Sequence, residues 1–151
     1  MAITQAMATS FKVEILDGIH NFGTGVIRAS TAADVFKLAL YTSSATLSAA
    51  TTAYSSADEV SSSGTNYTAG GLTLTISQVP TSSGTTAFID FDDLTFPSAT
   101  ITANGALIYN ATQGDKAVAV LAFGGDKTST AGNFTIQFPS PTSTTAILRI
   151  A

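Results

Sequence analysis

Few residues of this chain have side chains suited to acid–base or nucleophilic chemistry. Its 151 residues include one histidine and no cysteine. His20 follows apolar residues at helical spacing, where a histidine more often caps the last helical carbonyls than acts as a base or a ligand. No serine lies in a Gly-x-Ser-x-Gly turn, the usual setting of a hydrolase nucleophile. The sequence therefore predicts no catalytic residues and no enzyme; a hydrolase or metal-dependent enzyme would have to use His20 or Asp92.

The densest acidic group, Asp90, Asp92 and Asp93, is the best candidate for a metal site. Alternation along a strand places Asp90 and Asp92 on one face, and Asp93 falls where the strand ends. Calcium takes about six to eight oxygen ligands, so these carboxylates would need help from Asp115 or Asp126. We favour the simpler interpretation, a solvated strand face whose charge resists edge pairing. We expect neither a metal nor another cofactor.

The four tyrosines allow one further kind of site. Aromatic rings often line carbohydrate sites, but Tyr41, Tyr54, Tyr67 and Tyr109 are spread along the chain, and there is no tryptophan. Filling of the core or of an interface is therefore the favoured use of these rings.

The overall composition excludes several classes of protein. Only 11% of residues are charged and the formal net charge is −4, so the chain lacks the basic stripe of a nucleic-acid-binding protein. No apolar run is long enough to cross a bilayer, and the N-terminus does not resemble a secretory signal, so we expect synthesis in the cytoplasm and no membrane partner. Mean hydropathy is positive (+0.31), which indicates a surface partly covered by other subunits.

The N-terminal region is the main helical signal. Met7, Phe11, Ile15 and Ile19 recur at spacings of four, which predicts one amphipathic helix over residues 4–22. We assign residues 1–25 as an N-terminal helical arm, and these four side chains as its contacts with other subunits.

The rest of the chain reads as β-structure. Alternating or apolar runs predict strands near residues 34–41, 72–77, 87–94, 100–109, 118–123, 134–138 and 146–150. Pro80 and Pro97 are expected to end strands, and residues 124–126 to begin a loop. Asn104-Gly105 indicates either a hairpin turn or a bulge in one longer strand. The polar stretch 42–71 is expected to be a functional loop or to hold a weak element.

These features define the expected fold. It is mainly β, an antiparallel β-sandwich or jelly roll with one N-terminal amphipathic helix, and residues 1–151 form a single domain.

The whole chain resembles small virion structural proteins of tailed bacteriophages. The segments that carry this resemblance are residues 1–7, 10–12, 18–20, 36–42, 67–71, 105–110 and 123–127. They are strand and turn motifs, not catalytic ones, and they extend over nearly the full length.

The resemblance implies a bacteriophage virion structural protein, specifically a capsid decoration or cement protein that stabilises the head shell. Its partners would be copies of itself, with a trimer as the first expectation, and the major capsid protein or other virion proteins. The alternative within the same resemblance is a head-fibre or tail appendage that binds a receptor. In either case the protein would reside in the virion.

Overall fold

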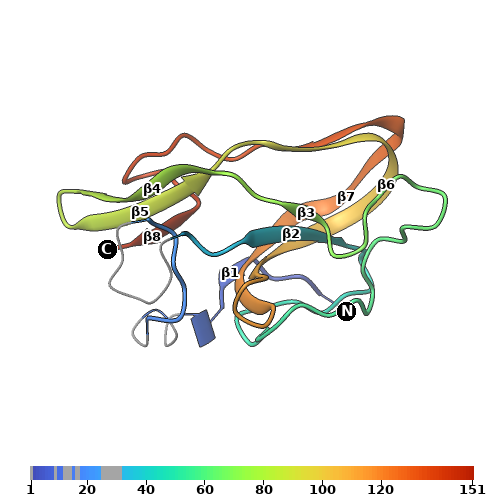
Figure 1. Cartoon of the computed structure of the whole chain (residues 1–151). Helices are drawn as coiled ribbons and strands as arrows, with labels where there is room; N and C mark the ends of the chain where they lie inside the picture. The colour runs from blue at the N-terminus through green and yellow to red at the C-terminus, as the bar shows by residue number, and fades with distance from the viewer. Residues whose placement is uncertain (1, 9, 12–14, 16–17, 25–31) are drawn as a thin grey trace.

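The computed structural model describes residues 2–8, 10–11, 15, 18–24 and 32–151. Eight β-strands make up its regular structure, arranged in two antiparallel sheets (Figure 1). The first sheet has five strands in the order β1-β7-β6-β2-β3, and the second has three in the order β4-β5-β8. The prediction of a mainly β, antiparallel fold is confirmed.

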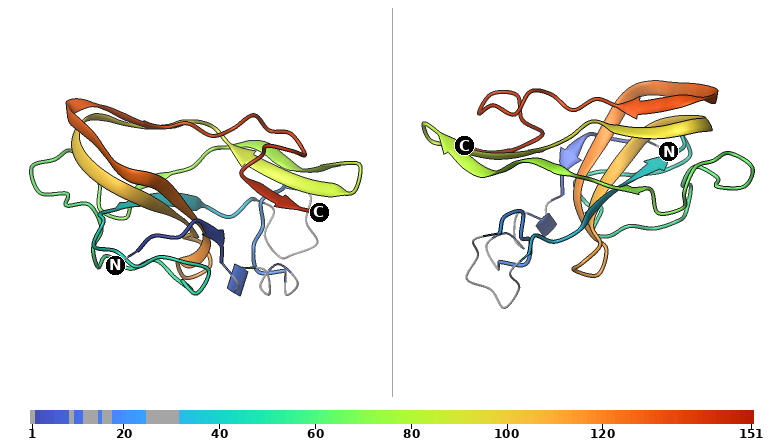
Figure 2. Two further views of the ribbon diagram at one scale, coloured as in Figure 1. Left: turned by 180° about the vertical axis from the view of Figure 1, so that it is seen from behind. Right: turned by 45° about the horizontal axis from the view of Figure 1, so that its top comes forward.

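The five-stranded sheet is built around one long hairpin. Its strands are β6 (Leu94–Asn110) and β7 (Lys116–Ile136), which pair from Leu94↔Ile136 to Asn110↔Lys116. The shorter strands β1 (Ala6–Met7), β2 (Phe36–Tyr41) and β3 (Leu72–Thr73) complete this sheet. Figure 2 shows the β6–β7 ribbon curving strongly along its length.

The second sheet lies at the end of the molecule that holds the C-terminus (Figures 1 and 2). Its strands are β4 (Ile76–Ser83), β5 (Thr86–Phe91) and β8 (Leu148–Ile150). The expected strand over 72–77 is instead two strands, because the chain passes from the first sheet to the second between Thr73 and Ile76.

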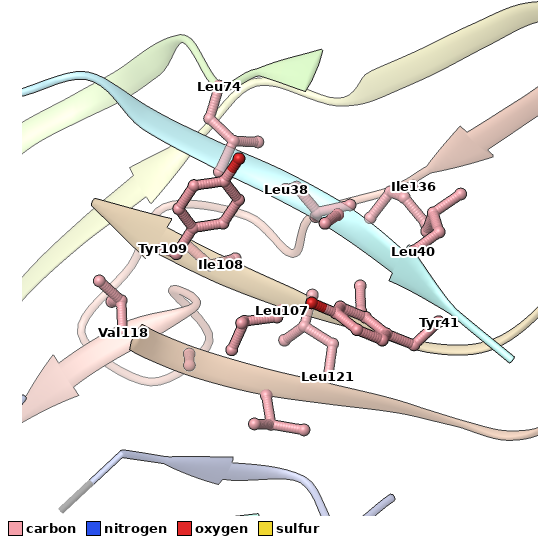
Figure 3. Packing of buried hydrophobic residues seen from close by; sticks show 14 of the residues in the cluster. Leu38, Leu40, Tyr41, Leu74, Leu107, Ile108, Tyr109, Val118, Leu121 and Ile136 are labelled. Carbon is pink, nitrogen blue, oxygen red and sulfur yellow. The ribbon is translucent and has the colours of Figure 1, made fainter. Parts of the chain in front are cut away.

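A single hydrophobic core joins the two sheets. Ile89, Phe91 and Leu148 of the second sheet belong to the same buried cluster as Leu38 and Leu107 of the first. Figure 3 shows part of this cluster, where side chains of the neighbouring strands β2, β6 and β7 lie close to one another. The strand expected near residues 118–123 is part of β7, and its first four residues are buried between β1 and β6.

Three expected strand ends are wrong. Pro80 lies inside β4, which tolerates it because β4 is an edge strand and its pairing with β5 shifts register there. Pro97 lies inside β6 at another register shift, and residues 124–126 continue β7. The chain absorbs these breakers as bulges within long strands and does not turn at them.

Asn104-Gly105 is a bulge and not a hairpin. Gly105 is required by close packing, because a Cβ there would lie 2.6 Å from the carbonyl oxygen of Leu121 and 2.9 Å from Ile3. The hairpin turn lies instead at residues 111–115, where Gly114 and Asp115 have positive φ.

The predicted helix over 4–22 is not shown. Ala6 and Met7 form a strand that pairs with Val120 and Ala119, since the backbone edge of β7 is available beside them. Ser10, Phe11 and Ile15 are helical, residues 19–22 are not, and residues 9, 12–14 and 16–17 of the predicted helix lie outside the described residues. Phe11 and Phe22 belong to the main core, so these parts of the arm pack on the β-strands.

Candidate functional site

The four tyrosines converge on one carboxylate, that of Glu59. Tyr41 ends β2 and Tyr109 lies near the end of β6, whereas Tyr54 and Tyr67 come from the 42–71 loop. Tyr54 donates its hydroxyl proton to Glu59 Oε2 (2.7 Å) and Tyr67 donates to Glu59 Oε1 (2.6 Å). We call this group, together with the backbone of Gly70, the Glu59 cluster.

Further hydrogen bonds of the Glu59 cluster tie the loop to the five-stranded sheet. The Gly70 N–H donates to Glu59 Oε1 (2.7 Å), and the Tyr109 hydroxyl donates to the Gly70 carbonyl (2.7 Å). Tyr67 also accepts from the Leu40 N–H (2.9 Å), and Tyr41 donates to the Ser55 carbonyl (2.6 Å). The rings of Tyr54 and Tyr109 stack with centroids 4.8 Å apart. The loop is thus held at several points along its length.

The electrostatics of the cluster keep the phenols protonated. Burial, and next to it the hydrogen bond to Glu59, raises the pKa of Tyr54 and Tyr67 well above the usual value. Burial also raises the pKa of Tyr41, and it raises the pKa of Tyr109 to about 12. These phenols act as hydrogen-bond donors near neutral pH, and Glu59 accepts three hydrogen bonds, two from Tyr54 and Tyr67 and one from the Gly70 N–H. The arrangement fixes a loop, and the favoured interpretation of the tyrosines as core-filling rings is confirmed for Tyr41, Tyr67 and Tyr109, which are buried.

A second polar cluster surrounds Asp34 and contains the single histidine. The Asn110 amide nitrogen donates to Asp34 Oδ2 (2.8 Å) and lies 3.0 Å from His20 Nδ1. Asn110 Oδ1 accepts from the N–H groups of Thr112 and Gln113, which fixes the orientation of the amide. His20 Nδ1 is therefore an acceptor, and the neutral ring carries its proton on Nε2. The ring of His20 therefore lies against the end of β6, and its expected role as a helix cap stays a prediction.

Asp34 anchors the N-terminal segment through the same cluster. Its Oδ2 also accepts from the Asn21 N–H (3.0 Å), and its own N–H donates to the Asn21 carbonyl (2.8 Å). Asn21, Asp34 and Asn110 are all buried, so each needs these bonds to offset lost solvation. The cluster joins three chain segments that are far apart in sequence.

The acidic group of β5 is not the solvated face expected from the sequence. Asp90 is fully buried, while Asp92 and Asp93 are exposed, because Asp90 points into the space between β5 and the segment before β8. Its carboxylate accepts from the N–H groups of Phe91 (2.9 Å) and Ile147 (3.4 Å). Burial raises the pKa of Asp90 despite these bonds. Within the described part of the chain, no three His, Asp or Glu side chains lie close enough to hold a metal ion.

The four predicted contact residues lie beside a cavity between the N-terminal segment and the second sheet. Phe11 is only 2% exposed, and Met7, Ile15 and Ile19 are half-buried. Met7, Phe11 and Ile15 line a mainly apolar cavity of about 160 Å³, with Phe88, Leu148 and Ile150 on its other side. Phe11 thus packs within its own chain, and a contact role for the other three stays a prediction.

Sequence reasoning missed Glu59 and Asp34 as the centres of polar clusters. Each is a single acidic residue near polar neighbours. The partners of Glu59 lie within 11 residues of it in the loop, whereas Asn110 reaches Asp34 because β2 pairs with β6. The sequence offered one clue to the importance of Asp34, which is a charged residue directly before the apolar residues of a predicted strand.

Comparisons with family models, curated proteins and solved structures found no match for this chain. Among the described residues, no helix has the length and apolar character needed to cross a membrane.

Proposed function

We propose that this chain is a structural protein of a tailed-bacteriophage particle, a capsid decoration protein that stabilises the head shell and is not an enzyme. The observation that carries the proposal is the use of its partly and fully buried carboxylates. Glu59, Asp34 and Asp90 each accept hydrogen bonds that fix one chain segment to another. Such groups make a rigid scaffold, and their acceptor atoms are already engaged.

Two further features support a role in assembly. The chain has few charges and a positive mean hydropathy, which suits burial of its surface between subunits. Three large apolar side chains, Val35, Val79 and Ile150, are about half exposed. In this proposal the two sheets act as a compact β-sandwich module that associates with copies of itself, as a trimer, and with the major capsid protein.

The proposal is tested on particles produced from the genome that encodes the chain. The particles are purified on a density gradient, heads are separated from tails, and peptides of this chain are quantified against the major capsid protein by mass spectrometry. We expect the chain in the head fraction at a copy number close to that of the capsid protein. Its absence from purified particles would overturn the proposal.

A head-fibre or tail receptor-binding module is the second candidate. The 42–71 loop favours it, because the Glu59 cluster fixes this long polar loop and a surface hollow of about 560 Å³ lies along it. The hollow is lined by small and polar residues, among them Thr46, Ser48 and Asp58. A few copies per particle in the tail fraction, together with glycan-array binding that is lost in Asp58→Asn, would favour this function over decoration.

A further inference from the structure

The C-terminal strand β8 is held by few interactions. It has three residues, and its pairs with β5 are Ala87↔Ile150, Phe88↔Arg149 and Ile89↔Leu148. Leu148 is buried, but Ile150 is 53% exposed. By contrast, β7 pairs with β6 over most of its 21 residues. The pairing of β5 with β8 is therefore much shorter than the pairing of β6 with β7.

The packing around β8 is also loose. The apolar cavity of about 160 Å³ touches Leu148 and Ile150, and a second cavity of about 230 Å³ touches Ile147 and Leu148. Both hollows open to the surface, so protein atoms contact the side chains of β8 on only part of their surface.

The segment that leads to β8 is long and mostly satisfies itself. Residues 137–147 contain no strand, and Thr142 and Thr145 bond with each other and with Ser140. Phe138 anchors the start of this segment, because its N–H donates to Asp93 (2.8 Å) and its ring lies 5.8 Å from that of Phe91, and the Ile147 N–H donates to Asp90 (3.4 Å) at the other end. Pro139 and Pro141 favour an extended chain at the start of the segment. Residues 139–146 can therefore redirect β8 while Phe138 stays in place, and the contact with β5 that is given up and re-formed by a second copy is that of Ile147 and β8.

We propose that the β5 edge is an interface that takes the β8 strand of a second copy of this chain, in a reciprocal exchange of residues 147–151. The structure shows that the edge of β5 pairs with β8, and β8 of a second copy has the same three residues and can pair in the same register. Exchange leaves each β5 paired and each Asp90 with its Ile147 partner. The other edge of the second sheet is formed by β4. It is a poorer site for an added strand, because β4 contains Pro80 and its pairing with β5 has two register shifts.

The balance between the closed and exchanged forms depends on protein concentration. The covalent link through residues 137–147 holds the chain's own β8 near β5 at an effective concentration on the order of millimolar. Dilute protein is then mostly closed, and exchange becomes competitive only when copies are crowded to similar concentrations. The expectation that copies are crowded on a particle surface depends on the proposed function, whereas the exchange itself does not.

The chain has no cysteine, which makes disulfide trapping a clean test. Two single variants, Ala87→Cys and Ile150→Cys, are mixed, held at about 10 µM or about 1 mM, and oxidised. Both positions are exposed and directly opposite in the β5–β8 pairing. Linkage of the two variants in excess of that in a control mixture of exposed cysteines reports that β8 of one chain lies on β5 of the other. We expect at least a tenfold larger linked fraction at the higher concentration.

The matched control is a mixture of Thr102→Cys with Thr128→Cys, an exposed pair within the β6–β7 hairpin, which should not exchange. Circular dichroism checks that every variant is folded, and Phe88→Cys with Arg149→Cys provides a second pair on the same strands. Linked product no more abundant than in the control, for both β5–β8 pairs at 1 mM, would overturn the exchange. That result would leave the mass-spectrometric test of the virion role unaffected.

Discussion

Glu59 is the residue on which the position of the 42–71 loop depends most. Its carboxylate accepts from Tyr54, Tyr67 and the Gly70 N–H. Glu59→Ala removes all three acceptor bonds in a half-buried setting, and we expect a loss of about 2 kcal/mol in the free energy of unfolding. Glu59→Gln keeps one acceptor oxygen for Tyr67 and Gly70 and should lose less than about 1 kcal/mol. Urea unfolding followed by circular dichroism measures both.

The control for Glu59 is Asp92→Ala, which removes one exposed acidic side chain on β5's C-terminal side. It should change the free energy of unfolding by less than about 0.5 kcal/mol. If Glu59→Ala were as mild as Asp92→Ala, the Glu59 cluster would not be holding the loop.

The tyrosines make stability sensitive to alkaline pH. Their pKa values are raised in the folded state, to about 12 for Tyr109, whereas an unfolded tyrosine ionises near its usual value of about 10. This contribution to stability is fully present below about pH 10 and is lost as the pH rises toward the folded-state values. Absorbance at about 295 nm should show tyrosinate forming at higher pH in native protein than in protein unfolded in urea. Coincident titration curves would contradict the buried, hydrogen-bonded phenols.

At the scale of elements, Gly71 fixes how closely the 42–71 loop approaches β2. Its φ is +71°, and a Cβ there would lie 1.7 Å from the carbonyl oxygen of Leu38. Gly71→Ala therefore forces β3 away from β2, and we expect a loss of about 2–4 kcal/mol in the free energy of unfolding. Gly64→Ala is the matched control, because Gly64 has φ +68° but no atom within 4 Å of the added carbon. Thermal unfolding should separate the two variants clearly, and equal losses would show that backbone strain alone accounts for Gly71.

The elements that could be predicted from the sequence were those whose alternation is continuous. The apolar core of β2 and the buried first half of β7 follow from local pattern alone. The long extent of β6 and β7 does not, because Pro97, Gly105 and Gly124 read locally as breaks. In the folded sheet each of these residues lies where the pairing of β6 with β7 shifts register or where another backbone passes close by. The local sequence contains neither piece of information.

At the scale of the whole molecule, the long-range contacts of the polar clusters could not be predicted because those residues meet only after the sheet has formed. Tyr109 reaches Gly70 across 39 positions of sequence, and Asn110 reaches Asp34 across 76. Composition correctly indicated a β-rich chain but carried no information on these contacts. The local sequence also did not show that Met7 belongs to a strand. Its spacing from Phe11 is helical, but its backbone pairs with the edge of β7.

The packing of the N-terminal segment gives the last prediction, which decides whether the segment is a separate arm or part of the folded unit. Phe11 is 2% exposed and meets the rings of His20 and Phe22 at centroid distances of 4.7 and 6.0 Å. Phe11→Ala should therefore cost about 3–4 kcal/mol in the free energy of unfolding, measured by urea denaturation. Val79→Ala, at a side chain that is 52% exposed, should change it by less than about 0.5 kcal/mol. A loss below about 1 kcal/mol for Phe11→Ala would mean that the segment can leave the core as an arm, since a detachable arm contributes little to the stability of the sheets it leaves.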